Sequence, residues 1–307
     1  MARSSPSTSK ASSPTKRQLG PFSVAPIGLG AMRLTGPGVF GPPPDRAGAL
    51  ALLREAVHRG VDHIDTAQYY GPDVVNELIR EALHPYPPEL VLVSKVGARR
   101  DGRGGVLADD EPAQLRRGIE DNLRTLGVSE LAVVNLRLMR DGGPDAFFDD
   151  QLAAMVSACD DGLIRSIGLS NVTLAHVLHA ARCTQLACVQ NAFNLANRAS
   201  QPVLDECSRR GIAFVPFAPL GSGSSGPNTV LGAAEVAAVA ARLGCTPAQV
   251  GLAWALDVSP GVLLIPGASS IGHLTENLAA ARVRLDSEAR QQLSRMVPAA
   301  SGPATVT

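Results

Sequence analysis

This chain lacks the features that most directly assign a protein to a class. It carries no net charge, with 28 basic and 28 acidic residues interspersed, and it has no basic stripe with aromatic residues. The sequence therefore argues against nucleic acid or an anionic membrane as a partner. No apolar run is long enough to cross a bilayer. Aromatic residues make up 4% of the chain, which gives no sign of a stacked polycyclic substrate.

Cysteines and histidines are few and scattered. The five cysteines form no Cys-x-x-Cys pair, so we expect reduced thiols in a cytoplasmic protein instead of a disulfide framework. The six histidines show no ligand spacing with an acidic residue. A zinc site and a metal-dependent barrel hydrolase are therefore poorly supported, and we predict no metal.

The residues that are present suffice for one large core. Hydrophobic residues make up 45% of the 307 positions, and no long polar linker divides the chain, which favours one domain over residues 21–307. Residues 1–20 are rich in Ser, Thr, Pro, Lys and Arg and contain no signal-peptide core. We expect that segment to be a disordered tail.

Short apolar runs alternate with amphipathic segments along the whole domain. The runs predict strands at residues 27–30, 61–65, 90–95, 131–136, 164–170, 187–190, 212–217 and 262–265. The amphipathic segments predict helices at residues 45–59, 72–83, 112–126, 148–159, 173–181, 201–210, 233–243 and 246–256. Glycines 60, 127, 162, 211 and 244 stand where such helices need a left-handed terminator.

This order predicts an α/β fold, a single closed (β/α)₈ TIM barrel with extra helices near the last strand and the C-terminus. An open, doubly wound sheet is the alternative. That fold usually carries a Gly-x-Gly-x-x-Gly turn after its first strand, whereas here Gly28-Leu29-Gly30 is followed by Arg33. We therefore favour the barrel, in which the site is built from the segments after the strands.

An acid, a phenol and an ammonium follow two successive predicted strands. Asp65 opens the motif Asp65-Thr66-Ala67-Gln68-Tyr69-Tyr70-Gly71, Tyr70 stands just before its final glycine, and Lys95 ends the next strand. Because the carboxyl ends of parallel neighbours share one rim, the three side chains are expected to meet. A phenol has a pKa near ~10, and an adjacent ammonium lowers it by favouring the phenolate. The trio suits proton donation by tyrosine.

Several motifs in this order resemble those of the aldo-keto reductases, from residue 27 to about residue 285. They are Gly28-Leu29-Gly30-Ala31-Met32, the Asp65–Gly71 motif, Ser94-Lys95, Gly168-Leu169-Ser170-Asn171, Gln190-Asn191-Ala192-Phe193-Asn194, Pro219-Leu220-Gly221 and Ile265-Pro266-Gly267 through Glu276-Asn277. The resemblance implies a reductase that moves a hydride from NADPH, with NADH possible, to an aldehyde or ketone. Tyr70 is then the proton donor, Lys95 lowers its pKa and Asp65 pairs with Lys95.

The family's fourth catalytic residue is a histidine at the end of the fourth strand, and the aligned residue here is Arg137. Arginine is a permanent cation with donors only, so it cannot act as a base. It could donate to the developing oxyanion, disfavour the positive charge on Lys95, or bind an anionic group of the substrate. It could also mark the loss of turnover in a silent NADP(H)-binding regulatory or redox-sensing protein, or simply reach out of the barrel to Asp141 or another surface acid. We favour a working enzyme, because the other three residues are retained.

The resemblance also implies a cofactor site. It places the cofactor at Gly30, Ala31, Met32, Asp65, Ser170, Asn171, Gln190, Phe217, Leu220, Gly221, Ser222, Gly267, Ala268, Ser269, His273, Glu276 and Asn277. Within this set, Ser170, Asn171 and Gln190 face the nicotinamide carboxamide, and Phe217 stacks on the ring. The segment from Gly267 to Asn277 holds the adenosine end. The substrate pocket is expected near Leu34, Phe40, Met139 and Pro227, with residues 36–44 folding over its mouth. A small carbonyl compound is the expected partner of a monomer or weak homo-oligomer.

Overall fold

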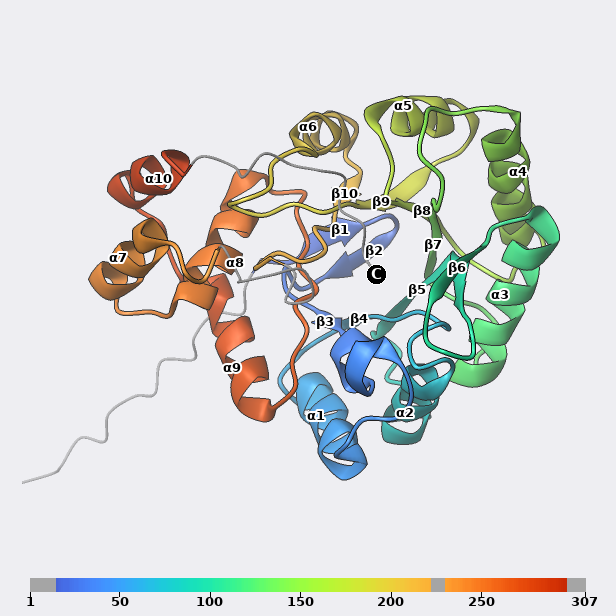
Figure 1. Ribbon diagram of the computed structural model, residues 1–307, viewed down its shortest axis with the longest axis horizontal. Coiled ribbons are helices and arrows are strands. Elements are labelled where there is room, and N and C mark those ends of the chain that lie inside the picture. Colours follow the sequence, from blue (N-terminus) through green and yellow to red (C-terminus); the bar gives the residue numbers. More distant parts are fainter. Residues whose placement is uncertain (1–14, 222–229, 297–307) are drawn as a thin grey trace, which may run out of the picture.

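The computed structural model describes residues 15–221 and 230–296. Seven parallel strands form a curled sheet in the order β10-β9-β8-β7-β5-β4-β3 (Figure 1). They are β3 (Leu29–Gly30), β4 (His63–Asp65), β5 (Val91–Arg100), β7 (Val133–Arg137), β8 (Ile167–Ser170), β9 (Leu186–Gln190) and β10 (Ala213–Phe214).

The predicted eighth strand closes this sheet into a barrel, although it is reduced to isolated parallel bridges. Val262 pairs with Phe214 of β10, and Leu264 pairs with Ile27, just before β3. The closed ring confirms the (β/α)₈ barrel and excludes the open sheet. A short eighth strand is sufficient here because both of its neighbours also bond to it through their backbones, as in Gly28 N–H to the Leu264 carbonyl at 2.8 Å.

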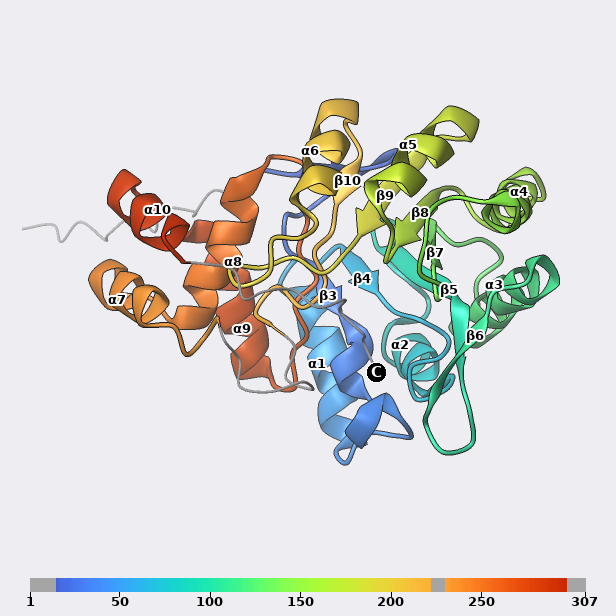
Figure 2. The same cartoon turned by 45° about the horizontal axis from the view of Figure 1, so that its top comes forward.

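Helices surround the ring (Figures 1 and 2). They are α1 (Arg46–His58), α2 (Val74–Leu83), α3 (Pro112–Leu126), α4 (Ala146–Asp160), α5 (Leu174–Cys183), α6 (Gln201–Arg210), α7 (Ala234–Leu243), α8 (Pro247–Val258), α9 (Ile271–Ala279) and α10 (Ser287–Ser294). Short 3₁₀ turns occur at η1 (Ala31–Leu34), η2 (Pro37–Val39) and η3 (Ala280–Arg282). Helices α7 and α10 stand outside the ring (Figure 1), and they are the extra helices predicted near the last strand and near the C-terminus.

Local sequence fixes the ends of α3, whose predicted bounds match the structure. Glu111 and Gln114 form a capping box, Pro112 occupies the first turn, and Gly127 ends the helix at φ 70°. The buried face carries Leu115, Ile119 and Leu126 at helical spacing. That face packs on β5 of the barrel and helps to position it.

A hairpin corrects the predicted tail boundary. Strands β1 (Arg17–Leu19) and β2 (Phe22–Val24) pair antiparallel, so residues 17–20 belong to the fold, whereas residues 1–14 lie outside the described ranges. Leu19 and Val24 are buried with interior barrel residues such as Val133. The hairpin therefore closes the amino-terminal end of the barrel and lies across the ring in Figure 1.

Strand β5 is longer than predicted and forms a second hairpin. It runs to Arg100 instead of ending at Lys95, and its last residues pair with β6 (Val106–Asp109). Gly97 makes this possible at φ 105°, because a Cβ there would lie 2.3 Å from the carbonyl oxygen of Arg137. Figure 2 shows β5 and β6 projecting beyond the ring. Because β5 continues past Lys95 to Arg100, this extension brings Arg100 to the carboxyl end of the barrel.

No single helix in the described ranges combines the length and hydropathy of a membrane span. Helices α7 and α8 reach those limits only when counted together, and they are bent by 94°.

Candidate active site

A buried ion pair lies inside the carboxyl end of the barrel. The Lys95 ammonium donates to Asp65 Oδ1 and, at 3.1 Å, to the carbonyl of Thr66. The two residues are 5% and 3% exposed. Burial alone would lower the pKa of Lys95, but the Asp65 carboxylate and the nearby tyrosines outweigh burial and raise it. Lys95 is therefore held as a cation.

The two tyrosines of the motif stand beside this pair. The Lys95 ammonium lies 5.2 Å from the centre of the Tyr70 ring. The Tyr69 ring contacts the Tyr70 ring edge-on, with the ring centres 5.3 Å apart. Both rings are buried. The structure thus brings together the predicted trio of Asp65, Tyr70 and Lys95, and it adds Tyr69, whose side chain the sequence analysis did not use.

A hydrogen bond across the barrel connects Gln190 to the ion pair. Gln190 Nε2 donates to Asp65 Oδ2 at 2.6 Å, from β9 on one wall to β4 on the other. Asp65 therefore accepts from Lys95 on one oxygen and from Gln190 on the second. This arrangement fixes the carboxylate and leaves the Gln190 carbonyl oxygen, Oε1, buried without a partner among the described residues.

A polar network behind the strands holds the site in place, and the sequence analysis did not foresee it. Thr66 Oγ1 donates to Asn76 at 2.8 Å, and Ser94 Oγ donates to Asn122 at 2.5 Å. Asn76 Nδ2 in turn donates to Asn122 Oδ1 at 2.9 Å and to Thr125 at 3.0 Å. The residues next to Asp65 and Lys95 are thereby tied to α2 and α3. Such fully paired buried groups rigidify a site.

Arg137 ends β7 in the position predicted for the fourth catalytic residue. Its Nε is buried without a hydrogen-bond partner, and the side chain forms no ion pair with any described residue. The predicted alternative, in which Arg137 reaches Asp141, is not observed. Burial raises the pKa of Tyr69 to about 12, although the charge of Arg137 acts in the opposite direction. Arg137 therefore lies within electrostatic reach of Tyr69.

Arg100 is a second cation at this rim, and sequence reasoning missed it. Burial lowers the pKa of Arg100, the two tyrosines oppose this effect, and Arg137 adds to it. Arg100 Nη1 donates to the carbonyl of Gly104 at 2.6 Å, while its Nε is buried without a partner in the described chain. The signal that could have found it is the continued strand pattern after Lys95.

The predicted carboxamide residues lie together at the ends of β8 and β9. The Ser170 hydroxyl is buried and has no partner among the described residues. Asn171 adopts φ 60°, its N–H donates to the Gln190 carbonyl at 3.0 Å, and its side chain donates to the Leu138 carbonyl at 2.9 Å. A buried hydroxyl and a buried amide oxygen without partners suit a ligand amide, which both donates and accepts.

The remaining predicted cofactor residues follow the last strands. Phe217 is half-buried and forms an isolated parallel bridge with Ala192, beyond the end of β10. Gly267 pairs with Gly30, and a Cβ on Gly30 would lie 2.3 Å from the Ile265 carbonyl oxygen. Ala31 is buried, Met32 is exposed, and Leu220 and Gly221 end the described part of that loop. Ser222 lies outside the described residues.

Hydrogen bonds within the protein already hold the predicted adenosine segment in shape. Asn277 donates to the Gly267 carbonyl at 3.2 Å, and Glu276 accepts from Thr246 at 2.5 Å. Ser269 and His273 approach to 3.1 Å and are exposed. Ala268 is buried beside them. These contacts fix the shape of the segment and leave exposed polar groups on its surface.

Of the predicted substrate-pocket residues, Phe40 comes closest to the site. Phe40 pairs with Gly71, next to Tyr70, and Gly41 N–H donates to the Gly71 carbonyl at 3.2 Å. Leu34 and Met139 instead pack against the barrel core. Pro227 lies outside the described residues.

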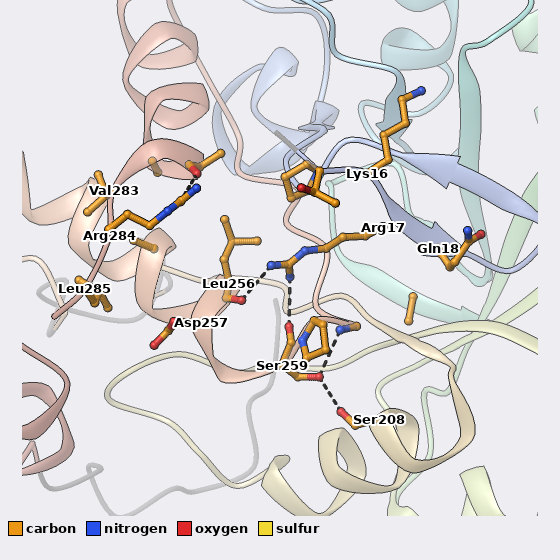
Figure 3. Close-up of a pocket in the computed structure, with 18 of the residues that line it drawn as sticks. Lys16, Arg17, Gln18, Ser208, Leu256, Asp257, Ser259, Val283, Arg284 and Leu285 are labelled. Carbon is orange, nitrogen blue, oxygen red and sulfur yellow. Dashed lines mark hydrogen bonds between the residues drawn. The ribbon is translucent and has the colours of Figure 1, made fainter. Parts of the chain in front are cut away.

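A hollow opens at the amino-terminal end of the barrel, on the side opposite the Lys95–Asp65 pair (Figure 3). Its volume is about 760 Å³, and residues of the β1 region, α8 and the chain after η3 line it. Its charged groups are engaged: Arg17 donates to the Leu256 and Ser259 carbonyls at 3.0 and 3.1 Å, and Arg290 pairs with Asp257. The hollow is separated from the Lys95–Asp65 pair by the barrel, so we place the active site at the carboxyl end.

Comparisons with known proteins agree with this geometry. The model of the Aldo/keto reductase family matches residues 26–297. Pyridoxine 4-dehydrogenase of Escherichia coli is 48% identical over 273 residues, which cover 88% of this chain and 94% of that protein. An uncharacterized oxidoreductase of Schizosaccharomyces pombe is 37% identical over 272 residues, 88% of this chain and 86% of that protein. An aldo-keto reductase of Klebsiella pneumoniae, crystallised with NADPH, has a TM-score of 0.76 at 27% identity and covers 94% of this chain and 97% of its own.

Proposed function

Because the chain belongs to the aldo/keto reductase family, we propose that this NADP-dependent oxidoreductase reduces an aromatic aldehyde, with Tyr70 as the proton donor. The observation that carries the proposal is the position of Tyr70 beside the buried Lys95–Asp65 pair. The family match gives the class of enzyme, and the ion pair gives the residues that act on the carbonyl.

NADPH is the proposed cofactor, and when bound it supplies the hydride. Related aldo-keto reductases of Klebsiella pneumoniae were crystallised with NADPH and with NADP and acetate. The residues here fit its nicotinamide end, because Ser170 Oγ and Gln190 Oε1 are buried without partners in the described chain. We propose that both bind the carboxamide and that the half-buried Phe217 stacks on the nicotinamide ring.

The chain's own residues account for the proton transfer. As a C–H bond forms at the carbonyl carbon, the electron pair of the C=O π bond moves to oxygen, which takes the proton from the Tyr70 hydroxyl. The phenolate left on Tyr70 is stabilised by the Lys95 ammonium, whose charge Asp65 maintains. Arg137 donates to the carbonyl oxygen and stabilises its developing negative charge.

The substrate is proposed from the most informative relative. The Escherichia coli protein is named a pyridoxine 4-dehydrogenase. Removal of two hydrogens from the 4-hydroxymethyl group of pyridoxine gives the 4-aldehyde, pyridoxal, and the reverse reaction is a carbonyl reduction. We therefore propose pyridoxal, an aromatic aldehyde, as substrate. A silent NADP(H)-binding protein is not favoured, because the retained Asp65, Tyr70 and Lys95 form a connected site and the relative is named for an activity.

The test is loss of nicotinamide absorbance when purified protein is mixed with NADPH and pyridoxal, with pyridoxine as the matched control. We expect NADPH oxidation with the aldehyde and none with the alcohol. In the reverse direction, NADP⁺ should be reduced with pyridoxine. If NADPH binds but neither pyridoxal nor a panel of simple aldehydes is reduced, the enzyme assignment fails and the silent-binding alternative takes its place.

Ser170→Ala should weaken NADPH binding without loss of stability. Its hydroxyl has no protein partner in the described chain, so its removal breaks no internal bond, whereas one hydrogen bond to the carboxamide is lost. A hydrogen bond of ordinary strength corresponds to about a two- to tenfold rise in Kd. Titration of protein fluorescence with NADPH measures the Kd, and urea unfolding measures stability.

Ser208→Ala is the matched control for that substitution. Ser208 approaches Ser259 at 2.8 Å at the far end of the barrel, so its removal should leave the NADPH Kd unchanged. An unaltered Kd in Ser170→Ala would remove Ser170 from the proposed cofactor site.

A further inference from the structure

We propose that Arg137, assisted by Arg100, binds an acidic hydroxyl on the carbon next to the one that carries the aldehyde, and so selects ortho-hydroxylated aromatic aldehydes. The inference rests on the proposed function, since it names which aldehydes that site prefers. It assigns Arg137 a role beyond contact with the carbonyl oxygen alone.

The Arg137 side chain lacks a hydrogen-bond and ion-pair partner among the described residues. Its Nε is buried without a partner, and no described acid pairs with the side chain. The residue as a whole is only partly buried, but a guanidinium donor shut off from water without a partner carries a desolvation cost, which a structural arginine ordinarily avoids by pairing. At the end of β7, where Arg137 pairs with Ser170 of β8, an anionic group on a bound molecule is the available counter-charge.

The local charge balance also favours an anionic ligand. Asp65 neutralises Lys95, which leaves Arg137 and Arg100 as cations at the same rim. Arg100 also has a buried Nε without a partner in the described chain. The Tyr69 hydroxyl, buried and likewise unpartnered, remains a neutral donor at physiological pH because burial raises its pKa to about 12. The Ser170 hydroxyl and the Gln190 carbonyl oxygen are assigned to the carboxamide, and the other unpartnered groups named here are cations or donors. This set favours an acceptor that carries negative charge.

The shape of the guanidinium matches two neighbouring oxygen atoms. A guanidinium presents parallel N–H groups in one plane and binds two neighbouring acceptors at once. An aldehyde oxygen and an ionised hydroxyl on the adjacent ring carbon lie side by side in one plane, as the two oxygens of a carboxylate do. A histidine offers a single N–H at a time toward such a pair. Arginine at this position therefore matches the ortho-hydroxy aldehyde and gives no such advantage to a para-hydroxy isomer.

The kinetic test compares 2-hydroxybenzaldehyde, 4-hydroxybenzaldehyde and benzaldehyde as substrates with NADPH. For the unmodified protein we expect kcat/KM to favour the ortho isomer over the other two by about 10- to 100-fold, the range expected for hydrogen bonds to a charged group. In Arg137→His and Arg137→Lys this preference should fall below about threefold, because neither side chain presents two parallel N–H groups in one plane. Arg99→Met is the matched control, since Arg99 pairs with Asp109 and is half exposed.

A binding test needs no turnover. The phenolate of 2-hydroxybenzaldehyde absorbs at longer wavelength than the phenol, so its ionisation can be followed in the complex with NADP⁺. Bound to the unmodified protein, the apparent pKa of this ligand should be about 1–3 below its value in buffer, as expected for an acid beside a cation. Arg137→His should abolish the shift, Arg100→Met should reduce it, and Arg99→Met should retain it.

The outcomes separate this inference from the proposed function. The inference is overturned, while aldehyde reduction stands, if kcat/KM for the ortho isomer equals that for benzaldehyde or that for the para isomer. If no aldehyde is reduced, the proposed function fails, and the spectral titration alone decides: an unshifted ligand pKa overturns the inference, and a shift abolished in Arg137→His supports it.

Discussion

Tyr70→Phe is expected to lower kcat for aldehyde reduction by about 10²- to 10⁴-fold and to leave the NADPH Kd unchanged. The substitution removes the hydroxyl that donates the proton and retains the ring that packs beside Lys95. The loss should appear in single-turnover measurements, where product release does not contribute. A fluorescence titration with NADPH checks that the cofactor still binds.

Tyr69→Phe is the matched control, since the two tyrosines are adjacent, buried and in edge-on contact. Its hydroxyl has no hydrogen-bond partner among the described residues, so we expect kcat for benzaldehyde to change less than tenfold. The opposite pattern, with Tyr69→Phe inactive and Tyr70→Phe active, would transfer the proton-donor role to Tyr69 and refute our assignment.

The second large effect is on stability. Asp65→Asn should lower the free energy of unfolding by about 3–5 kcal/mol, because it leaves the buried Lys95 ammonium without its counter-charge. Burial then acts on Lys95 alone and lowers its pKa, so the unfolded chain binds more protons than the folded one. The stability of this variant relative to the unmodified protein should therefore improve as the pH rises toward 10. Urea unfolding at several pH values measures both effects.

The double variant Asp65→Asn/Lys95→Met tests the cause. Removing both members of a buried ion pair is often close to neutral, so the double variant should recover most of the stability that Asp65→Asn loses. It should nevertheless stay inactive, because the ammonium beside Tyr70 is gone. A double variant as unstable as Asp65→Asn would show that Asp65 stabilises the fold through Gln190 instead of Lys95.

Much of the fold could be predicted because local signals fix its helices. The bounds of α3 and α6 match prediction, since a capping box or proline at the start and a left-handed glycine at the end leave little freedom. Strand lengths were less predictable. The strand predicted at residues 262–265 is only a set of bridges, and β5 runs to Arg100, because pairing partners distant in sequence decide where a strand stops.

The amino-terminal hairpin escaped prediction for a similar reason. Three-residue strands carry almost no periodicity, and the Ser- and Pro-rich composition of residues 1–20 masks Leu19, whose burial depends on the barrel interior. At the active site, strand ends placed Asp65, Tyr70 and Lys95 correctly side by side. Arg100 and the Asn76–Asn122 contact were missed, because both depend on how α3 and the β5–β6 hairpin pack.

The hairpin at the amino-terminal end also bears on how the protein can be shortened. Because Leu19 fills the interior and Arg17 holds the backbone carbonyls of Leu256 and Ser259, a fragment that begins at residue 21 would lose part of its hydrophobic core together with an anchor for α8. A fragment designed to fold should therefore start before Arg17. An affinity tag fused directly to residue 21 would take the place of residues 17–20, which belong to the fold.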